Sequence, residues 1–140
     1  MTGELLQRLE DRWMISELLA RYASAYDDDK LEDMRSLMTE TGVERGERDG
    51  AELWTLEGPD AAIAGLTAAR AAQPWPGRHV ISNLMFDQLD GSDATVRYYL
   101  MLVGAPEGTP LLRNFGWYRT TLVKRDGRWL ITAKTAFLTV

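Results

Sequence analysis

The sequence contains one histidine, His79, which begins a segment with strand character, and an acidic cluster, Asp27-Asp28-Asp29, about fifty residues upstream. Imidazole is a general base that works near neutral pH. A carboxylate that accepts a hydrogen bond from one ring nitrogen keeps the other nitrogen available for a substrate proton. We therefore expect Asp27 to orient His79 as a catalytic base. The alternative is that Asp27 only caps a helix and that His79 only packs at the end of a strand.

Three further polar residues have positions that suit a binding site. Asn83 lies on the same strand face as His79 if side chains alternate, and it either donates to a ligand or satisfies backbone groups. Lys134 lies between apolar residues of the last expected strand, so it either faces solvent or is buried beside an anionic partner. Glu44 either supplies a second acid or belongs to a solvated charged edge, residues 44–49.

The composition excludes several classes of function. A net charge of −5 over 140 residues argues against a nucleic-acid partner, because phosphate contacts need a basic surface. The absence of cysteine excludes disulfides and thiolate metal sites, and one histidine is too few for a histidine-rich metal site. The glycine motifs of phosphate-binding and dinucleotide-binding loops are also missing. We therefore expect no metal and no cofactor.

The length of the chain is typical of one domain, and we expect a single domain over residues 1–140. No run of about 18 apolar residues could cross a membrane. The first residues also lack the pattern of a secretory signal. We expect a cytoplasmic protein without membrane contact.

Apolar spacing predicts three helices, over residues 4–26, 31–38 and 59–72. Asp29 is a candidate N-cap of the second helix, and Pro59 suits the first turn of the third. The first helix should bury one face, which carries Ile15, Leu18, Leu19, Tyr22 and Tyr26, with Leu5, Leu9 and Trp13 leading in.

Three turn signals divide the rest of the chain into strands: Asp49-Gly50, Asp90-Gly91 and Asp126-Gly127. Two weak strands are expected between residues 43 and 56, and four long ones over 79–89, 95–103, 111–124 and 129–140. Helices followed by long antiparallel strands indicate an α+β fold. We expect a cone-shaped, curved antiparallel sheet that wraps around the N-terminal helices and encloses an internal pocket.

Three segments in this order, residues 15–27, 78–83 and 116–118 leading to 125–129, resemble the SnoaL-like family of the nuclear transport factor 2-like superfamily. The resemblance implies the cone-shaped fold and, as in the scytalone dehydratase, dehydrochlorinase and polyketide cyclase-like branch, a dyad of Asp27 and His79. It also implies that Tyr22 is a catalytic pocket tyrosine. Scytalone dehydratase has a second catalytic histidine on the next strand; this chain has none, which excludes a two-histidine mechanism.

The resemblance further implies a set of pocket side chains that would bind a hydrophobic substrate with some oxygenation. Lys134 would steady a leaving group or an oxyanion. Some of the leucines would equally suit a plain sheet core. The expected substrate-binding set is Tyr98, Leu100, Leu102, Asn114 and Tyr118, with Gly116 on the same face and with Glu44, Asn83 and Lys134 added.

The function that the resemblance implies is a cofactor-independent lyase of the dehydratase type, acting on a mid-sized hydrophobic, oxygenated small molecule. A cyclase or isomerase for a polyketide- or steroid-like substrate would use the same dyad. A non-catalytic ligand-binding or assembly subunit would not need it. We expect a homodimer or homotrimer with Trp117 and Trp129 in the interface. The sequence leaves open the substrate and the choice among these reactions.

Overall fold

The computed structural model describes residues 2–140, which form two α-helices, two short 3-10 helices and one six-stranded sheet. The helices are α1 (Gly3–Asp27), η1 (Leu31–Leu37), α2 (Pro59–Ala72) and η2 (Pro106–Gly108). The strands are β1 (Met38–Arg48), β2 (Ala51–Glu57), β3 (Arg78–Leu89), β4 (Asp93–Gly104), β5 (Leu111–Arg125) and β6 (Arg128–Leu138). The expected α+β fold is confirmed.

The strands follow the order β2-β1-β6-β5-β4-β3. Neighbouring strands are antiparallel except β1 and β6, which are parallel. The sheet is therefore mixed, whereas an antiparallel sheet was expected. No hairpin links β1 to β6, and therefore no turn fixes their relative direction. The hairpins β1–β2 and β5–β6 close on Asp49-Gly50 and Asp126-Gly127, where both residues have the positive φ that a two-residue type I′ turn requires.

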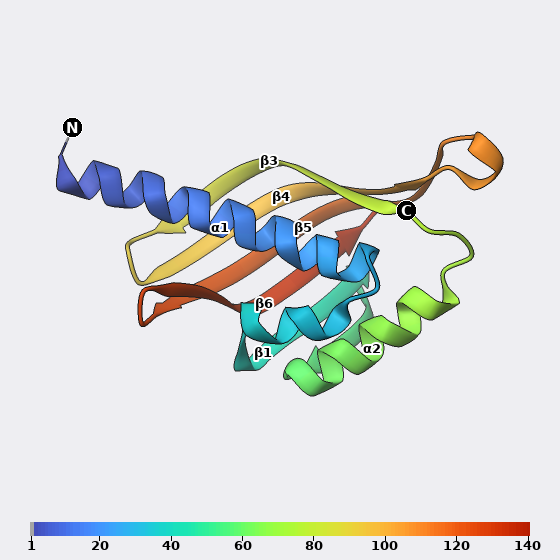
Figure 1. Cartoon of the computed structure of the whole chain (residues 1–140), viewed down its shortest axis with the longest axis horizontal. Coiled ribbons are helices and arrows are strands. Elements are labelled where there is room, and N and C mark those ends of the chain that lie inside the picture. The colour runs from blue at the N-terminus through green and yellow to red at the C-terminus, as the bar shows by residue number, and fades with distance from the viewer. Residues whose placement is uncertain (1) are drawn as a thin grey trace.

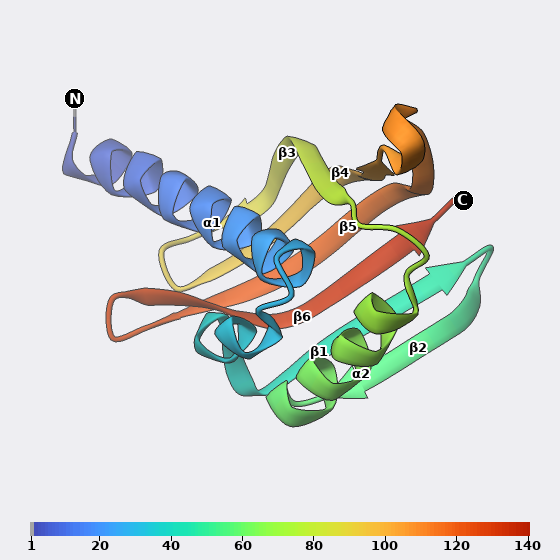
Figure 2. The same ribbon diagram turned by 45° about the vertical axis from the view of Figure 1, so that its right-hand side comes forward.

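The two α-helices cover the inner face of the curved sheet. Helix α1 lies across the strands from β3 to β6 (Figure 1) and contacts β3 and β6. Helix α2 lies against β1 and β2 (Figure 2) and also contacts η1. The space between the helices and the sheet holds the core and the pocket described below.

Helix α1 uses its second half for packing. Ile15, Leu19 and Tyr22 are buried there as expected. The expectation that Leu5, Leu9 and Trp13 would lead into the core is wrong: all are exposed, and Trp13 keeps 74% of its surface. Leu5 and Leu9 belong to the first turns of α1, which extend past the end of the sheet, as Figure 1 shows. Trp13 lies on the helix face opposite the buried Asp11 and Ile15, each two residues away.

A buried polar contact holds α1 against the last hairpin. Asp11 is 1% exposed, and its Oδ1 accepts hydrogen bonds from Trp129 Nε1 at 3.0 Å and from Lys124 Nζ at 2.9 Å. The expectation that Trp129 fills a subunit interface is therefore wrong, because the indole is buried within the protein. Trp117 lies half-buried on the outer face of the sheet and stacks on Phe137, with ring centroids 4.1 Å apart.

The segment after α1 differs from the second predicted helix. Leu31–Leu37 form a 3-10 helix, and β1 begins at Met38. Asp29 has φ 57° and belongs to the preceding turn; the N-cap is Lys30, whose side chain makes no capping bond. Asp29 thus reverses the chain direction, because aspartate tolerates the left-handed conformation better than most residues.

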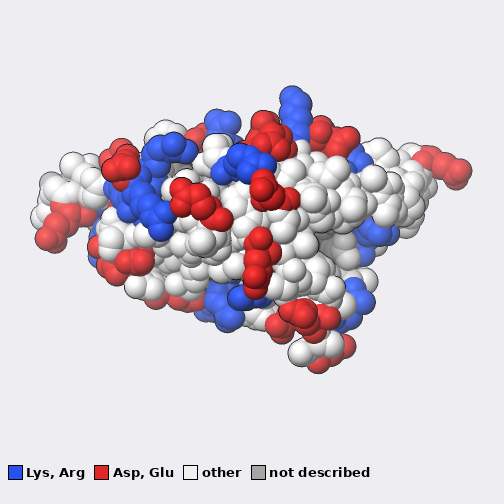
Figure 3. Space-filling model, turned by 90° about the horizontal axis from the view of Figure 1, so that it is seen from below, with Lys and Arg blue, Asp and Glu red and all other residues white. Residues whose placement is uncertain are grey.

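Acidic and basic side chains are interspersed on the face of the molecule shown in Figure 3. This face therefore lacks the basic patch that phosphate backbones need. No helix in residues 2–140 is long and apolar enough to cross a membrane.

Candidate active site

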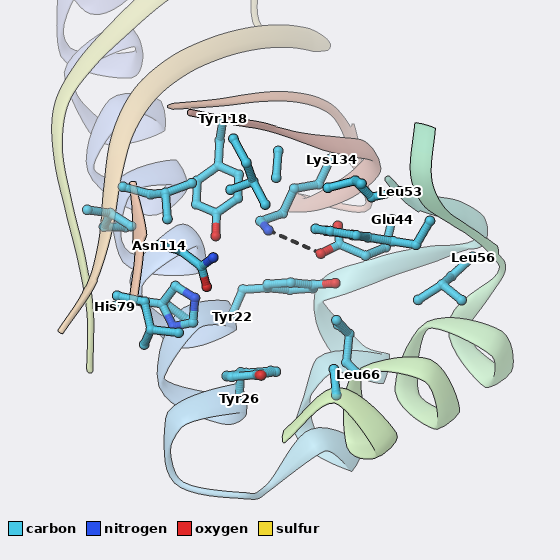
Figure 4. A pocket seen from close by; sticks show the side chains of 18 of the residues that line it. Tyr22, Tyr26, Glu44, Leu53, Leu56, Leu66, His79, Asn114, Tyr118 and Lys134 are labelled. Carbon is cyan, nitrogen blue, oxygen red and sulfur yellow. Dashed lines mark hydrogen bonds and ion pairs between the residues drawn. The ribbon is translucent and has the colours of Figure 1, made fainter. Parts of the chain in front are cut away.

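A cavity of about 410 Å³ lies between α1, α2 and the inner face of the sheet, and its lining is mainly apolar. Figure 4 shows its polar side chains at two ends, around His79 and around Glu44. His79 is on β3 and Glu44 on β1, which are separated in the sheet by β6, β5 and β4. Curvature of the sheet brings both strands to the same cavity.

Asp27 and His79 make a two-point contact at one end of the cavity. Asp27 Oδ1 lies 2.7 Å from His79 Nδ1, and Asp27 Oδ2 accepts a hydrogen bond from the His79 backbone N–H, also at 2.7 Å. Their side chains are only 5% and 14% exposed, respectively. The contact assigns the proton of a neutral imidazole to Nδ1 and leaves Nε2 as the basic nitrogen. This is the geometry of an oriented general base.

The position of Asp27 has a cost for the helix. It is the last residue of α1, where the helix dipole disfavours a negative charge, and the last turn contains no basic residue. The hydrogen bonds from His79 offset this cost, and Arg70 Nη2 donates to the backbone carbonyl of Asp27 at 3.3 Å. An acid at this end of a helix is explained better by its contact with His79 than by capping.

Aromatic packing restricts the imidazole from a second side. The Tyr26 ring meets His79 edge-on, with centroids 5.2 Å apart, and the Tyr26 hydroxyl donates to Gln73. On β4, Leu102 pairs with His79 and also lines the cavity. The ring is therefore held by hydrogen bonds and by packing.

Tyr22 lies between the two polar ends, with its hydroxyl directed away from His79 and toward Glu44 (Figure 4). Burial, and then the negative charge of Glu44, raise the pKa of Tyr22 well above its usual value. The phenol therefore stays protonated. Its oxygen is buried and has no hydrogen-bond partner within residues 2–140.

Glu44 and Lys134 form a buried ion pair at the other end. They are register partners on the parallel strands β1 and β6, and Lys134 Nζ donates to Glu44 Oε1 at 3.3 Å. The alternatives in which either residue faced solvent are thus wrong, since both are less than a tenth exposed. Burial raises the pKa of Glu44, and the charge of Lys134 counteracts this only in part. Lys134 Nζ also lies 3.7 Å from the centroid of the Tyr118 ring.

The strand residues expected in the pocket are there. Tyr98, Leu100, Leu102, Asn114 and Tyr118 all line the cavity. The Tyr98 hydroxyl is paired with Thr120 at 2.8 Å, which leaves it less available to a ligand. In Figure 4, the Tyr118 hydroxyl and the Asn114 amide point toward the His79 end. Burial, followed by the charges of Glu44 and Asp27, raises the pKa of Tyr118, so this phenol also remains a donor.

Asn83 is the exception, and its assignment to the pocket is wrong. It is exposed, has φ 59°, and falls where the pairing of β3 with β4 shifts between Ser82 and Met85. This bulge breaks the strict alternation on which the assignment depended. Beyond it, Leu84 and Phe86 pack against the core in place of Asn83 and Met85.

Trp54 is a pocket residue that the sequence pattern did not indicate. It lines the cavity from β2, and its indole Nε1 is buried without a hydrogen-bond partner within residues 2–140. Its cross-strand neighbour is Gly46, where a Cβ atom would lie 2.1 Å from the indole ring. Glycine opposite a tryptophan is the signal that could have revealed an indole folded over β1.

The residues that the structure describes include no group of three or more histidine, aspartate or glutamate side chains placed to hold a metal ion. The polar groups of the cavity are instead a histidine–carboxylate pair, a lysine–carboxylate pair and tyrosine hydroxyls. Such a set can move a proton and donate hydrogen bonds to a developing negative charge.

Comparison with known proteins identifies the fold and the family. A sequence model of the SnoaL-like domain matches residues 7–135. The Rv3472 protein of Mycobacterium tuberculosis, whose function is unknown, is 26% identical, with a TM-score of 0.83 over 97% of this chain and 76% of that chain. No curated protein matches the sequence.

Two solved structures from Novosphingobium aromaticivorans share the fold at lower identity. The β subunit of a protein assigned to the aromatic-ring-hydroxylating dioxygenases is 17% identical, with a TM-score of 0.81 over 94% of this chain and 91% of that chain. A protein assigned to the scytalone dehydratases is 20% identical, with a TM-score of 0.78 over 96% and 87%. The fold therefore occurs in different functional settings, and the function has to be argued from the site.

Proposed function

The chain belongs to the family of SnoaL-like domains, and we propose on this basis that it is a cofactor-independent lyase that eliminates water from a mid-sized, hydrophobic, oxygenated small molecule. The observation that carries the proposal is the two-point contact of Asp27 with His79 in the cavity wall. A packed histidine needs no carboxylate on both its ring and its backbone. A general base needs a fixed orientation and a defined tautomer.

In the proposed reaction, His79 Nε2 removes a proton from the carbon next to a carbonyl group of the substrate. The electron pair of the broken C–H bond moves onto the carbonyl oxygen and gives an enolate. Asp27 stabilises the imidazolium that forms, because its carboxylate accepts the Nδ1 hydrogen bond at 2.7 Å. Positioned acid–base catalysis of this kind contributes about 10²–10⁴-fold in rate.

In the second step the enolate re-forms the carbonyl and expels the β-hydroxyl group. The imidazolium of His79 returns its proton to the departing oxygen, so a carbon–carbon double bond and one water molecule are formed. One imidazole serves both steps if the proton and the hydroxyl leave from the same face of the substrate. The chain has a single histidine, which favours this syn course.

The enolate oxygen needs a hydrogen-bond donor. Tyr22, which the resemblance favours for this role, has a protonated hydroxyl, but that hydroxyl is directed toward Glu44. Tyr118 also remains protonated, and its hydroxyl points toward the His79 end. We therefore assign the oxyanion contact to Tyr118, with Tyr22 donating to a more distant oxygen of the same substrate.

Isomerisation and cyclisation remain the nearest alternatives, because both proceed through the same enolate. Returning the proton to a different carbon, or attack of the enolate carbon on a second carbonyl, would need no further residue. A ligand-binding subunit is the alternative from another class, and it would not depend on His79 Nε2.

The experiment is a screen of β-hydroxy ketones with two or three rings, followed by the ultraviolet absorbance of the enone product. Wild-type protein should be active with and without a chelator, and His79→Gln should lose about 10²–10⁴-fold in kcat. Tyr26→Phe is the matched control and should remain active, because it keeps the ring that packs on His79. Full activity of His79→Gln, or loss of activity with chelator, would overturn the proposal.

A further inference from the structure

The Glu44 end of the cavity contains three buried polar atoms that have no hydrogen-bond partner within residues 2–140: Glu44 Oε2, the Tyr22 hydroxyl oxygen and Trp54 Nε1. Unpaired buried polar atoms are uncommon and costly in folded proteins. All three residues line the same cavity. Together they supply one acceptor, one donor and one hydroxyl that does both.

Neighbouring groups constrain the positions of these three side chains. Glu44 is 3% exposed and held through its other oxygen by Lys134, while Lys134 is fixed over the Tyr118 ring. Trp54 lies over Gly46, where any side chain would collide with the indole. The unpaired atoms are therefore presented at defined positions.

The electrostatics of this end favour a neutral group. A carboxylate or phosphate of the ligand would approach the negative Glu44, and an ammonium group would approach the positive Lys134. A hydroxyl group avoids both, because it can donate to Glu44 Oε2 and accept from Trp54 Nε1 or Tyr22.

We propose that Glu44, Trp54 and Tyr22 form a second subsite that binds a neutral hydroxyl group of the ligand, at the end of the cavity opposite His79. The ligand is then a molecule of about two or three rings, since a cavity of about 150 Å³ holds one benzene ring and this one has about 410 Å³. It carries a hydroxyl at one end and the reacting carbons at the other. This inference rests on the proposed function in two respects: it takes the same cavity as the ligand site, and it places the reacting carbons near His79.

The test compares the dissociation constants of 2-naphthol, 2-methylnaphthalene and 2-naphthoate, measured by titration calorimetry. The three probes share two fused rings and differ in one substituent. Wild-type protein should bind 2-naphthol about ten- to a hundredfold more tightly than 2-methylnaphthalene, the range expected for hydrogen bonds to charged groups. Binding of 2-naphthoate should be the weakest.

Three variants localise the effect. Tyr22→Phe removes one hydroxyl group and keeps the ring, so it should weaken the binding of 2-naphthol several-fold and leave that of 2-methylnaphthalene unchanged. Trp54→Phe removes the indole N–H together with part of the ring system, so its effect is judged by the ratio of the two affinities, and the preference for 2-naphthol should fall several-fold. The double variant Glu44→Leu/Lys134→Met replaces the ion pair with apolar groups of similar size, which buried pairs often tolerate, and should abolish the preference. If the double variant does not fold, the two phenylalanine variants still decide.

His79→Gln is the control that separates this inference from the proposed function. It should keep the preference for 2-naphthol, because His79 lies at the other end (Figure 4). A wild-type protein with the preference but no lyase activity would contradict the proposed function alone. Equal binding of 2-naphthol and 2-methylnaphthalene, no binding of 2-naphthol, or an unchanged preference in all three variants would overturn the subsite.

Discussion

The carboxylate of Asp27 accepts two hydrogen bonds from one residue, His79, through the ring Nδ1 and through the backbone N–H. This contact joins the end of α1 to the start of β3 across 52 positions of sequence. It fixes the orientation and the tautomer of the imidazole ring, and it also fixes the backbone at the start of β3. The dyad is therefore also a structural link between the helix and the sheet.

Asp27→Asn should lower kcat by about 10²–10⁴-fold, because the amide can bind the ring in the wrong tautomer. The free energy of unfolding should change by less than about 1 kcal/mol. The amide can keep both contacts, since it can accept from the His79 backbone N–H and donate to Nδ1, and the weakening of these bonds is offset by removal of a negative charge from the C-terminal end of α1, which is worth about 0.3–1 kcal/mol. Steady-state kinetics and urea unfolding check both parts. A loss of several kcal/mol with activity retained would assign Asp27 a structural role.

Lys134→Met should destabilise the protein by about 3–5 kcal/mol at neutral pH, because it leaves Glu44 buried without its partner. The folded-state pKa of Glu44 is raised above its ordinary value of 4.5 by burial. A raised carboxyl pKa stabilises the folded state at pH values below the ordinary pKa of 4.5. This stabilisation is lost as the pH rises through the folded-state pKa. Lys134 lowers the pKa of Glu44 in the wild-type protein, so its removal raises this pKa further, and the variant should therefore be most stable, relative to wild type, in acid.

The double variant Lys134→Met/Glu44→Gln is the control for this pH dependence. It lacks the buried carboxyl, so its difference from wild type should vary much less between pH 4 and pH 8. Urea unfolding at several pH values measures both proteins. A Lys134→Met variant whose stability relative to wild type does not fall with rising pH would mean that Glu44 is not buried as described.

Asp11→Asn should cost about 1.5–3 kcal/mol at neutral pH, since it weakens charge-assisted hydrogen bonds. Burial alone would raise the pKa of Asp11, but hydrogen bonds from Lys124, Trp129 and Gln7 outweigh it and lower the pKa below 3.8. Stability from a lowered carboxyl pKa is present above the ordinary value and is lost as the pH falls through the folded-state value. The difference between the two proteins should therefore shrink in strong acid, and a difference that grows there would contradict the contact.

The outer face of the sheet exposes Val80, Tyr99, Met101 and Phe115, and the Trp117–Phe137 stack adjoins them. Exposed apolar patches of this kind mark interfaces. A homodimer or homotrimer thus remains our prediction, with Trp117 but not Trp129 in contact with a partner subunit. Light scattering at micromolar concentration measures the mass, and Tyr99→Glu should reduce it to that of a monomer. A monomeric wild-type protein would disprove the prediction.

Local sequence patterns were sufficient to predict most of the secondary structure. Pro59 and the alanine-rich run after it gave α2 with the bounds that the structure shows, and the Asp49-Gly50 and Asp126-Gly127 turns fixed two hairpins. The predictions that were wrong concern residues whose positions depend on long-range packing or on a local irregularity of a strand. Asn83 required knowledge of a bulge, and the burial of Trp129 required knowledge of its contact with Asp11.

The candidate site divides in the same way. The Asp27–His79 pairing followed from residue types and the family resemblance, and the geometry agrees with it. The pairing of Glu44 with Lys134 was not predictable, because it depends on the parallel register of β1 and β6, which no hairpin specifies. Trp54 was missed because alternation in the short strand β2 does not indicate which face the curved sheet buries.

Proton abstraction by His79 is tested most directly by hydrogen–deuterium exchange at the carbon next to a ketone. In D₂O, nuclear magnetic resonance follows the loss of the α-proton signals of 2-tetralone, which has two rings and no leaving group, so elimination cannot interfere. Wild-type protein should accelerate exchange over buffer, and His79→Gln should lose about 10²–10⁴-fold of that acceleration. Exchange as fast with His79→Gln as with wild type, or no faster with wild type than with buffer, would contradict the assignment of His79 as the base.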